Sequence, residues 1–264
     1  MFSMCLSIFE ERVLGPVESA GKFFLFSSKA LKSIFASPFR YGELLKHIDF
    51  VGNQSIGIIV LTGVFTGLAL SFQIWIGFSM LGAGDLVGPT VALAITREIG
   101  PVLTGLVISA RAGGAMAAQI GTMRVSEQID ALEVMGIEPI QYLVGPRVVA
   151  SVLATPLLCA VFDFMAMLAS YCLSVFFLGL DEGVYWERIQ LWVQPSHVFE
   201  GLIKTAIFGL FFGLFCTFRG FTTRGGARGV GEATNRGVVI SMVMVIVLDY
   251  FVSNFIRFYN LVTG

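Results

Sequence analysis

The sequence predicts an all-α integral membrane protein, and two observations support this fold class. First, 56% of the 264 residues are hydrophobic and only 13% are charged, which is too few charges for a water-soluble domain of this length. Second, several apolar runs are longer than the roughly 20 residues that a helix needs to cross a bilayer. We expect an N-terminal interfacial amphipathic helix, five transmembrane helices, and one short cytoplasmic helix between the second and third of them.

Residues 1–45 form the predicted interfacial amphipathic region, and residues 46–264 form the predicted five-span domain. Between residues 11 and 35, apolar side chains recur at helical spacing and most charged side chains fall elsewhere around the helix. This pattern is typical of a helix that lies flat with one face in lipid. A helix packed on the protein is the alternative. No cleavable signal peptide is expected, because Glu10 and Glu11 follow a first apolar stretch without a basic segment before it.

The five predicted spans cover residues 53–78, 86–122, 146–179, 197–218 and 237–260. The second and third exceed what one crossing needs, so we expect them to tilt, break or protrude from the bilayer. Pro101 and Pro156 are the candidate kink sites. Small residues four apart, as at Gly63 and Gly67, let helices approach closely. They indicate packing within the chain or, alternatively, a dimer seam.

Basic residues in the connections predict the orientation in the membrane. Residues 219–236 contain four arginines and one acidic residue, and Arg124 and Arg147 flank the connection between the second and third spans. The connections at 77–85 and 180–195 are poor in Lys and Arg. By the positive-inside rule the basic connections are cytoplasmic, which places the N-terminus in the cytoplasm and the C-terminus outside.

Four ionisable residues lie well inside the predicted spans, namely Arg97, Glu98, Lys204 and Asp249. A charge at the bilayer centre costs a few kcal/mol, so these side chains should face the protein interior or a wet cavity and should pair. The candidate pairs are Arg97 with Asp249, or Glu98 with Lys204. Such pairs could fix the helix bundle, or they could line a polar cavity that receives a charged or zwitterionic head group. The two interpretations are compatible.

Two further charges are interpreted separately. Asp163 stands more alone in the third span, and we expect it to be protonated. Arg111 begins a stretch of small residues towards the cytoplasmic half of the second span. We expect its side chain to cap backbone carbonyls or to reach the membrane interface, which is a structural role.

A polar segment at residues 124–139 separates the second and third spans and contains four acidic residues. It predicts a short amphipathic helix over about residues 126–136, with Ser126 as the N-cap and with Gly136 and Pro139 ending it. The apolar side of this helix would consist of Ile129, Leu132, Val134 and Met135. A membrane protein with such a helix on one face usually presents it to a soluble partner.

The sequence contains no catalytic pattern. It has no G-x-x-x-x-G-K-[ST] loop that could hold a nucleotide, no hydrolase triad or zinc-protease motif, and no basic tract for nucleic acid. The four cysteines and two histidines lack metal-ligand spacing. The glycine-rich stretch 225–231 lacks the lysine of a phosphate-binding loop, and we interpret it as a flexible loop. We therefore expect a transport subunit without its own cofactor or metal rather than an enzyme.

Longer motifs indicate a family. The segments that begin at Arg97, Ala110 and Gly121 read REIGPV, ARAGGA and GTMRVSEQIDAL. Together with GLIKT from Gly201 and VLDY from Val247, they resemble the MlaE/YrbE family, the permeases of ABC lipid transporters that work with MCE proteins. The resemblance runs from about residue 40 to the end of the sequence, and the first 40 residues match only in their amphipathic character.

The resemblance implies a homodimer in the bacterial inner membrane. Such a permease moves phospholipid, or a related lipid, between that membrane and a periplasmic MCE-domain hexamer, towards or from the outer membrane. ATP and Mg²⁺ would be bound by a separate cytoplasmic P-loop ATPase dimer, which a STAS-domain protein accompanies in some members. The family's intramembrane charged positions match Arg97, Glu98, Lys204 and Asp249. Its ATPase-coupling helix matches residues 126–136, with Glu127, Asp130, Ala131, Leu132, Glu133, Met135 and Gly136 as the coupling residues.

Two other functions stay open from the residues alone. A proton-coupled secondary transporter would use the buried charges as a proton relay and would need no ATPase, and inverted internal repeats would favour it. A non-transporting membrane scaffold would tolerate neutralisation of the buried charges.

Overall fold

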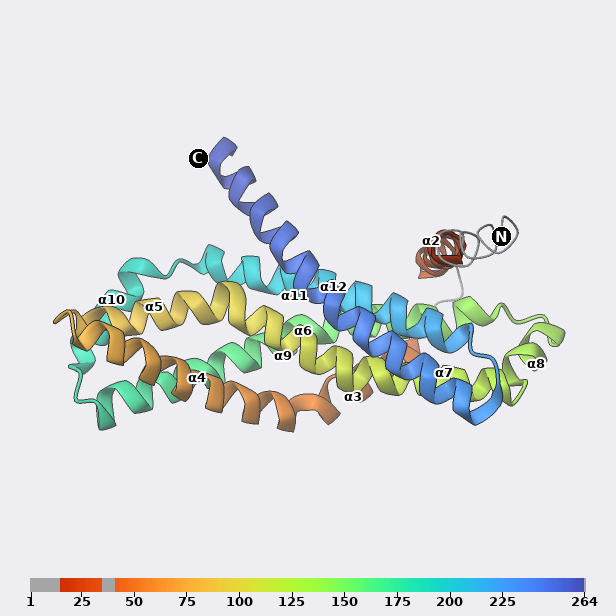
Figure 1. The fold of residues 1–264 in the computed structure, drawn as a ribbon, viewed down its shortest axis with the longest axis horizontal. Helices are drawn as coiled ribbons and strands as arrows, with labels where there is room; N and C mark the ends of the chain where they lie inside the picture. Colours follow the sequence, from red (N-terminus) through yellow and green to blue (C-terminus); the bar gives the residue numbers. More distant parts are fainter. Residues whose placement is uncertain (1–14, 35–40, 264) are drawn as a thin grey trace, which may run out of the picture.

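The computed structural model describes residues 15–34 and 41–263, and within these ranges the chain is helical apart from short turns. Five helical stretches are long and apolar enough to cross a membrane: Tyr41–Ser79, Gly84–Val125, Ile140–Phe177, Pro195–Phe221 and Gly226–Tyr259. They run roughly along the long axis of the molecule (Figure 1). The predicted all-α membrane fold with five spans is confirmed, and the second and third spans are long, with 42 and 38 residues.

The long stretches are assembled from shorter helices. In chain order the α-helices are α2 (Gly15–Ile34), α3 (Tyr41–Val51), α4 (Ile56–Ser79), α5 (Val87–Ala94), α6 (Gly100–Ile108), α7 (Gly114–Val125), α8 (Gln128–Val134), α9 (Gly145–Tyr171), α10 (Glu182–Trp192), α11 (Pro195–Phe221) and α12 (Gly226–Thr263). Turns of 3₁₀ helix (η2, Asn53–Ser55; η3, Gly84–Leu86) and π-helical segments (η4, Ile95–Ile99; η5, Ser109–Gly113; η6, Ile140–Val144; η7, Cys172–Phe177) join them. A π-helical turn contains one extra residue and is frequent at functional sites.

The connections sort to the two ends of the bundle as the charge pattern predicts. The short helix α8, which follows Arg124, and the α11–α12 turn, which contains Arg224, lie at one end (right in Figure 1). The α4–α5 connection and α10, which are poor in Lys and Arg, lie at the other end. Buried apolar side chains hold the bundle together, and the largest cluster joins α3, α4, α5, α9 and α11 around Phe162 and Phe212.

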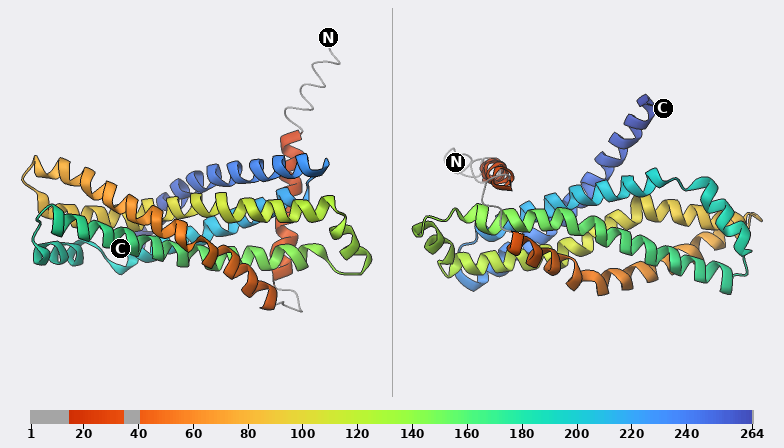
Figure 2. Two further views of the ribbon diagram at one scale, coloured as in Figure 1. Left: turned by 90° about the horizontal axis from the view of Figure 1, so that it is seen from below. Right: turned by 180° about the vertical axis from the view of Figure 1, so that it is seen from behind.

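Helix α2 crosses the bundle nearly at right angles to the spans (Figure 2, left). One face packs on α11, where Phe26 and Ala30 are buried and the ring of Phe26 lies 5.4 Å from that of Phe218. The other face leaves Phe24 and Leu25 exposed. The helix is therefore both packed on the protein and apolar on its outer side. Its position in the membrane interface stays a prediction, and residues 11–14 and 35 of the predicted helix lie outside the described ranges.

Glycines in the spans serve close packing within the chain. A Cβ atom at Gly63 would lie 2.9 Å from the carbonyl oxygen of Phe162, and one at Gly67 would overlap Ala166, so α4 and α9 are in backbone contact. A Cβ at Gly209 would lie 2.6 Å from the carbonyl oxygen of Ser151, which brings α11 equally close to α9. The intramolecular interpretation of the glycine spacing is confirmed for these pairs of helices.

The prediction of a flexible loop at residues 225–231 was wrong, because α12 begins at Gly226. The reversal of the chain is completed at Gly225 and Gly226, both of which have positive φ angles. Side-chain contacts at helical spacing follow in α12. Thr234 Oγ1 donates a hydrogen bond to the Val230 carbonyl, and Arg236 forms an ion pair with Glu232. The later glycines of this stretch cost helix propensity, but within a 38-residue helix that packs on α7 and α11 the loss is small.

The connection at 180–195 contains the helix α10, which the sequence did not predict. Pro156 lies inside the continuous helix α9, and a kink there stays a prediction. At Pro101, by contrast, the helix is irregular: the π-helical segment η4 directly precedes Gly100, and Pro101 is in the first turn of α6.

Candidate functional site

Lys204 is the centre of a charge cluster deep in the bundle. Its side chain is only 2% exposed. Its Nζ atom lies 3.1 Å from Oε2 of Glu98 and 3.2 Å from Oδ1 of Asp249, so α11 is linked to η4 and to α12. A buried ammonium needs such partners because the surrounding medium cannot solvate it. Glu98 lies about 21 Å along the helix axis from the end of its span, which places the cluster well inside the bilayer.

The irregular backbone at Pro101 supplies a third partner for Lys204. Proline has no N–H, so the carbonyl four residues earlier, at Arg97, lacks its usual helical donor. The Nζ atom of Lys204 donates a hydrogen bond to this carbonyl oxygen at 2.6 Å. Within a membrane such an unpaired carbonyl must find a donor inside the protein. The π-helical segment η4, Pro101 and Lys204 therefore form one structural unit.

Arg97 pairs with Glu200, whose Oε2 lies 3.4 Å from the arginine NH2. The predicted pair of Arg97 with Asp249 was therefore wrong, whereas the pair of Glu98 with Lys204 is confirmed. The physical reason is the helical repeat of α11. Glu200 and Lys204 are four residues apart, so they lie on one face and meet the adjacent residues Arg97 and Glu98.

The sequence analysis missed two members of the cluster. Glu200 pairs with Arg97, and the hydroxyl of Ser253 donates to Glu98 at 3.3 Å. Both could have been found by spacing, because Glu200 is four residues before Lys204 and Ser253 is four residues after Asp249. Each extra residue is thus one helical turn from a predicted one.

The cluster is open on one side. Glu98 is 50% exposed and Arg97 is 36% exposed, whereas Asp249 is 16% exposed. A small pocket lies beside them, to which Ile256 and Arg257 of α12 contribute. A half-exposed carboxylate at this depth needs water or a further polar partner, because hydrocarbon would not solvate it. The open side therefore faces a space that is not filled with lipid tails.

Asp163 and Arg111 lie outside this cluster. Asp163 is buried; its Oδ2 lies 3.7 Å from the Cys159 sulfur, and its Oδ1 has no hydrogen-bond partner. Its protonation stays a prediction. Arg111 hydrogen-bonds the carbonyl oxygen of Phe50 and the side chains of Gln54 and Ser55, where α3 gives way to η2. The interpretation of Arg111 as a cap of backbone carbonyls is confirmed.

The second candidate site is the short helix α8, whose N-terminal end differs from the prediction. Ser126 is not its N-cap: it follows α7 directly, and its hydroxyl donates to the Thr122 carbonyl of that helix. Glu127 precedes Gln128 instead, with φ of 59°, and no side chain caps α8. The sequence rule failed here because only two residues separate α7 from α8, and one of them, Glu127, makes the turn in the left-handed conformation.

Gly136 ends α8 as predicted. It has φ of 76°, its N–H bonds the Glu133 carbonyl at 2.9 Å, and the next N–H, of Ile137, bonds the Leu132 carbonyl at 3.0 Å. This pair of bonds is a Schellman motif, which satisfies carbonyls at a helix end and requires a left-handed residue. Gly136 therefore sets the direction in which the chain returns towards the third span.

Helix α8 divides its apolar residues between the protein and the outside. Ile129 is completely buried, and Leu132 packs with it against Ile120 of α7 and Leu143 of η6. Val134 and Met135 are 89% and 65% exposed. Leu132 is partly buried and contributes to the base of the helix, and its contact with a partner stays a prediction.

The acidic residues in and beside α8 also differ in their contacts. Asp130 forms an ion pair with Arg124 at the end of α7, so its carboxylate helps to hold α8 against the preceding helix. Glu127, Ala131 and Glu133 are exposed. The outward surface of α8 thus combines two exposed apolar side chains with carboxylates, at the end of the bundle farthest from α10 (Figure 1).

These features define a class of membrane transport protein, in which five spans carry a buried charge cluster and a short helix protrudes at one end. The model of the family described as Permease MlaE matches residues 44–255. The chain therefore belongs to the MlaE permease family.

Curated relatives cover most of the chain. A protein of Rickettsia bellii named "Probable ABC transporter permease protein" is 34% identical over 92% of this chain and 94% of its own length. The chloroplastic protein TRIGALACTOSYLDIACYLGLYCEROL 1 of Arabidopsis thaliana is 35% identical over 88% of this chain and 66% of its own. The intermembrane phospholipid transport system permease protein MlaE of Haemophilus influenzae is 33% identical over 78% of this chain and 80% of its own.

Proposed function

We propose that this chain is the membrane-spanning subunit of an ABC transporter that moves phospholipid between the inner membrane and a periplasmic partner protein. Membership of the MlaE family and the name of the Haemophilus influenzae relative support this function. The observation in the structure that supports it most is the half-exposed Glu98 beside the buried Lys204. An ionisable pair that is open on one side at this depth suits a cavity that takes up a lipid head group.

A cytoplasmic P-loop ATPase dimer would bind ATP and Mg²⁺ and would dock on α8. The exposed Val134 and Met135 suit a groove on such a partner, and Glu127 and Glu133 would contact its basic residues. Asp130 and Leu132 would act indirectly, because they hold α8 on the permease. Ala131 would let the partner approach the helix backbone closely, and Gly136 would end the helix at the required position.

A second copy of the chain would complete the lipid cavity. The outer part of α12 diverges from the bundle (Figure 1). This helix leaves Ile246, Tyr250 and Phe251 exposed, and it contributes Ile256 and Arg257 to the pocket beside the charge cluster. An apolar surface next to charged groups is consistent with a homodimer whose interface encloses the head-group site.

The orientation follows from the charges at the two ends. Arginines gather at the α8 end, at Arg124, Arg219, Arg224, Arg228 and Arg236. This end would be cytoplasmic, with α2 in the inner interface and the C-terminus in the periplasm. The α10 end would face an MCE-domain hexamer, and a STAS-domain protein would be bound through the ATPase where one exists.

In the proposed cycle, ATP binding closes the ATPase dimer and pushes the two copies of α8 together. Helix α8 is tied to α7 by the Arg124–Asp130 pair and to η6 through Ile129 and Leu143. The push therefore reaches the second and third spans together. Their movement would narrow the outward-facing cavity and drive lipid towards the periplasmic ring.

The test is purification of the chain in mild detergent from cells that express its partners, with mass spectrometry of bound proteins and lipids. We expect a P-loop ATPase, an MCE protein and phospholipid. Val134→Asp with Met135→Asp should abolish ATPase binding, whereas Leu81→Asp, at an equally exposed position at the opposite end, should not. Retention of the ATPase by the double variant would contradict docking on α8. Transport that follows a proton gradient without an ATPase would replace the proposal by a secondary transporter.

A further inference from the structure

A second pocket lies at the opposite end of the molecule from α8, between α9 and α10. It has a volume of about 410 Å³, within the range of small-molecule sites. Helix α9 contributes Phe164, Met167, Leu168 and Tyr171. These positions follow the i, i+3, i+4, i+7 pattern, so they form one continuous stripe along the helix. The pocket shares no residue with the Lys204 cluster.

Helix α10 contributes a matching stripe, Glu182, Tyr185, Trp186 and Ile189, with the same spacing. The two stripes face each other and differ along their length. The α9 end is purely apolar at Phe164 and Leu168, both of which are exposed. The other end carries the Glu182 carboxylate and three aromatic rings. The groove is therefore amphipathic, with its apolar end deeper in the span and its acidic, aromatic end near the span terminus.

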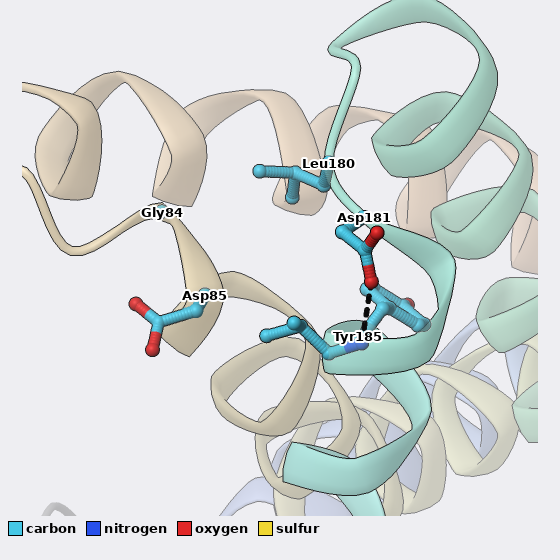
Figure 3. A pocket seen from close by; sticks show the side chains of 6 residues that line it. Gly84, Asp85, Leu180, Asp181 and Tyr185 are labelled. Atoms are coloured by element: carbon cyan, nitrogen blue, oxygen red, sulfur yellow. Dashed lines mark hydrogen bonds between the residues drawn. The ribbon is translucent and has the colours of Figure 1, made fainter.

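The groove has rigid walls. The hydroxyl of Tyr185 lies 3.1 Å from Ser170 Oγ, which in turn accepts a hydrogen bond from Ser71 of α4 at 2.6 Å. Asp181 caps α10 by accepting a hydrogen bond from the Val184 N–H at 2.9 Å. Figure 3 shows this cap beside a neighbouring pocket, which lies between α10 and the α4–α5 connection. These bonds fix the rotation of α10, so Glu182 and Trp186 are held towards α9.

The charged end of the groove is complementary to an ammonium group. Tyr171, Tyr185 and Trp186 have ring centroids 5.6–6.0 Å apart, and the Tyr171 hydroxyl donates to Glu182 Oε1 at 2.7 Å. Among the described residues, the ion pairs around α10 leave Glu182 without a cationic partner, since Arg188 pairs with Asp85. Aromatic rings around a carboxylate attract amine and quaternary ammonium head groups.

We infer that this groove binds one zwitterionic phospholipid, with its ammonium group at Glu182 and the aromatic rings and an acyl chain along Phe164 and Leu168. The occupant is a lipid rather than a soluble amine because the larger part of the groove is apolar and lies beside the bilayer. This site is separate from the proposed transport cavity and does not depend on ATP. Its failure would therefore leave the proposed function untouched.

The test uses the full chain in nanodiscs with a phosphatidylethanolamine that carries a diazirine on one acyl chain. We expect cross-links to peptides of α9 and α10, and competition by unlabelled phosphatidylethanolamine but not by phosphatidylglycerol with the same chains. Glu182→Gln combined with Trp186→Ala should reduce labelling about fivefold. Glutamine keeps the acceptor for the Tyr171 hydroxyl, so the variant tests the charge and the ring.

Two controls separate head-group recognition from simple lipid contact. Phe164→Ala should reduce labelling, whereas Leu157→Ala, seven residues earlier on the same exposed face of α9, should not. Equal competition by phosphatidylglycerol, or unchanged labelling in the Glu182→Gln, Trp186→Ala double variant, would overturn the inference. Cross-links from this groove to another polypeptide in place of lipid would also overturn it. Thermal unfolding of every variant identifies any that fail to fold.

Discussion

The charge cluster around Lys204 and the helix α8 are stabilised in opposite ways. Lys204 is 2% exposed and depends on partners from η4 and α12, which are distant in the sequence. Helix α8 has seven residues, most of them exposed, and depends on its own backbone turns, on the Asp130–Arg124 ion pair and on one fully buried side chain, Ile129. Changes in the cluster should therefore lower stability and transport together. Changes on the surface of α8 should impair coupling and leave the fold intact.

The largest effect is expected for Lys204→Met. The substitution leaves Glu98, Asp249 and the Arg97 carbonyl without their shared partner, and breaking a buried ion pair in this way costs about 3 kcal/mol or more. Thermal unfolding in detergent and a phospholipid transfer assay should both show the loss.

A matched variant sharpens this result. Lys204→Met combined with Glu98→Gln and Asp249→Asn removes the uncompensated charges and should recover a large part of the stability but not of the transport. Full transport in this triple variant would show that the cluster is only a structural brace, as the scaffold interpretation requires.

The next effect is expected for Ile129→Ala at the base of α8. The side chain is fully buried among Ile120, Leu132 and Leu143, so truncation should cost about 2 kcal/mol and loosen α8. Val134→Ala, at an 89% exposed position of the same helix, should change the free energy of unfolding by less than about 0.5 kcal/mol. Hydrogen exchange of α8 would detect the difference, and equal protection in both variants would contradict the packing assigned to Ile129.

A smaller effect on stability is expected for Glu127→Asn. Asparagine tolerates the left-handed conformation of this residue, with φ of 59°, so the fold should be unchanged. Loss of one exposed carboxylate should weaken ATPase binding by about two- to fivefold, the range for a surface ion pair. Binding measured at two salt concentrations would test this, and an unchanged affinity would remove Glu127 from the docking surface.

The sequence predicted which segments span the membrane and which charged residues lie inside them. It predicted less well how these charges pair. Long apolar runs and a glycine at a helix end are both local signals. The sequence therefore predicted the five spans and the end of α8 at Gly136. The pairing of Arg97 with Glu200 depends on the relative rotation of α11 and η4, which no local pattern encodes. The assignment of Arg97, Glu98, Lys204 and Asp249 to one lipid-handling site came from their depth in the spans and from the family resemblance, and it stays a prediction.

The errors share a physical cause, because they arose from rules derived for isolated helices. Ser126 has the composition of an N-cap, but α7 continues up to it and uses its hydroxyl. Glycines at 225–231 predict a loop in water, whereas α12 is extended through them by its packing on α7 and α11. Tertiary contacts decided each case.

The most direct test of the account compares Gly136→Ala with Gly82→Ala in liposomes that contain the permease and its ATPase. Both glycines have positive φ angles, 76° and 67°, and neither has a neighbour within 4 Å of an added Cβ, so each alanine should cost about 1 kcal/mol of backbone strain. They lie on opposite ends, at α8 and in the α4–α5 connection. We predict that Gly136→Ala keeps ATP hydrolysis but loses most phospholipid transfer, whereas Gly82→Ala keeps both. Equal transfer by the two variants would contradict the claim that α8 transmits the work of the ATPase.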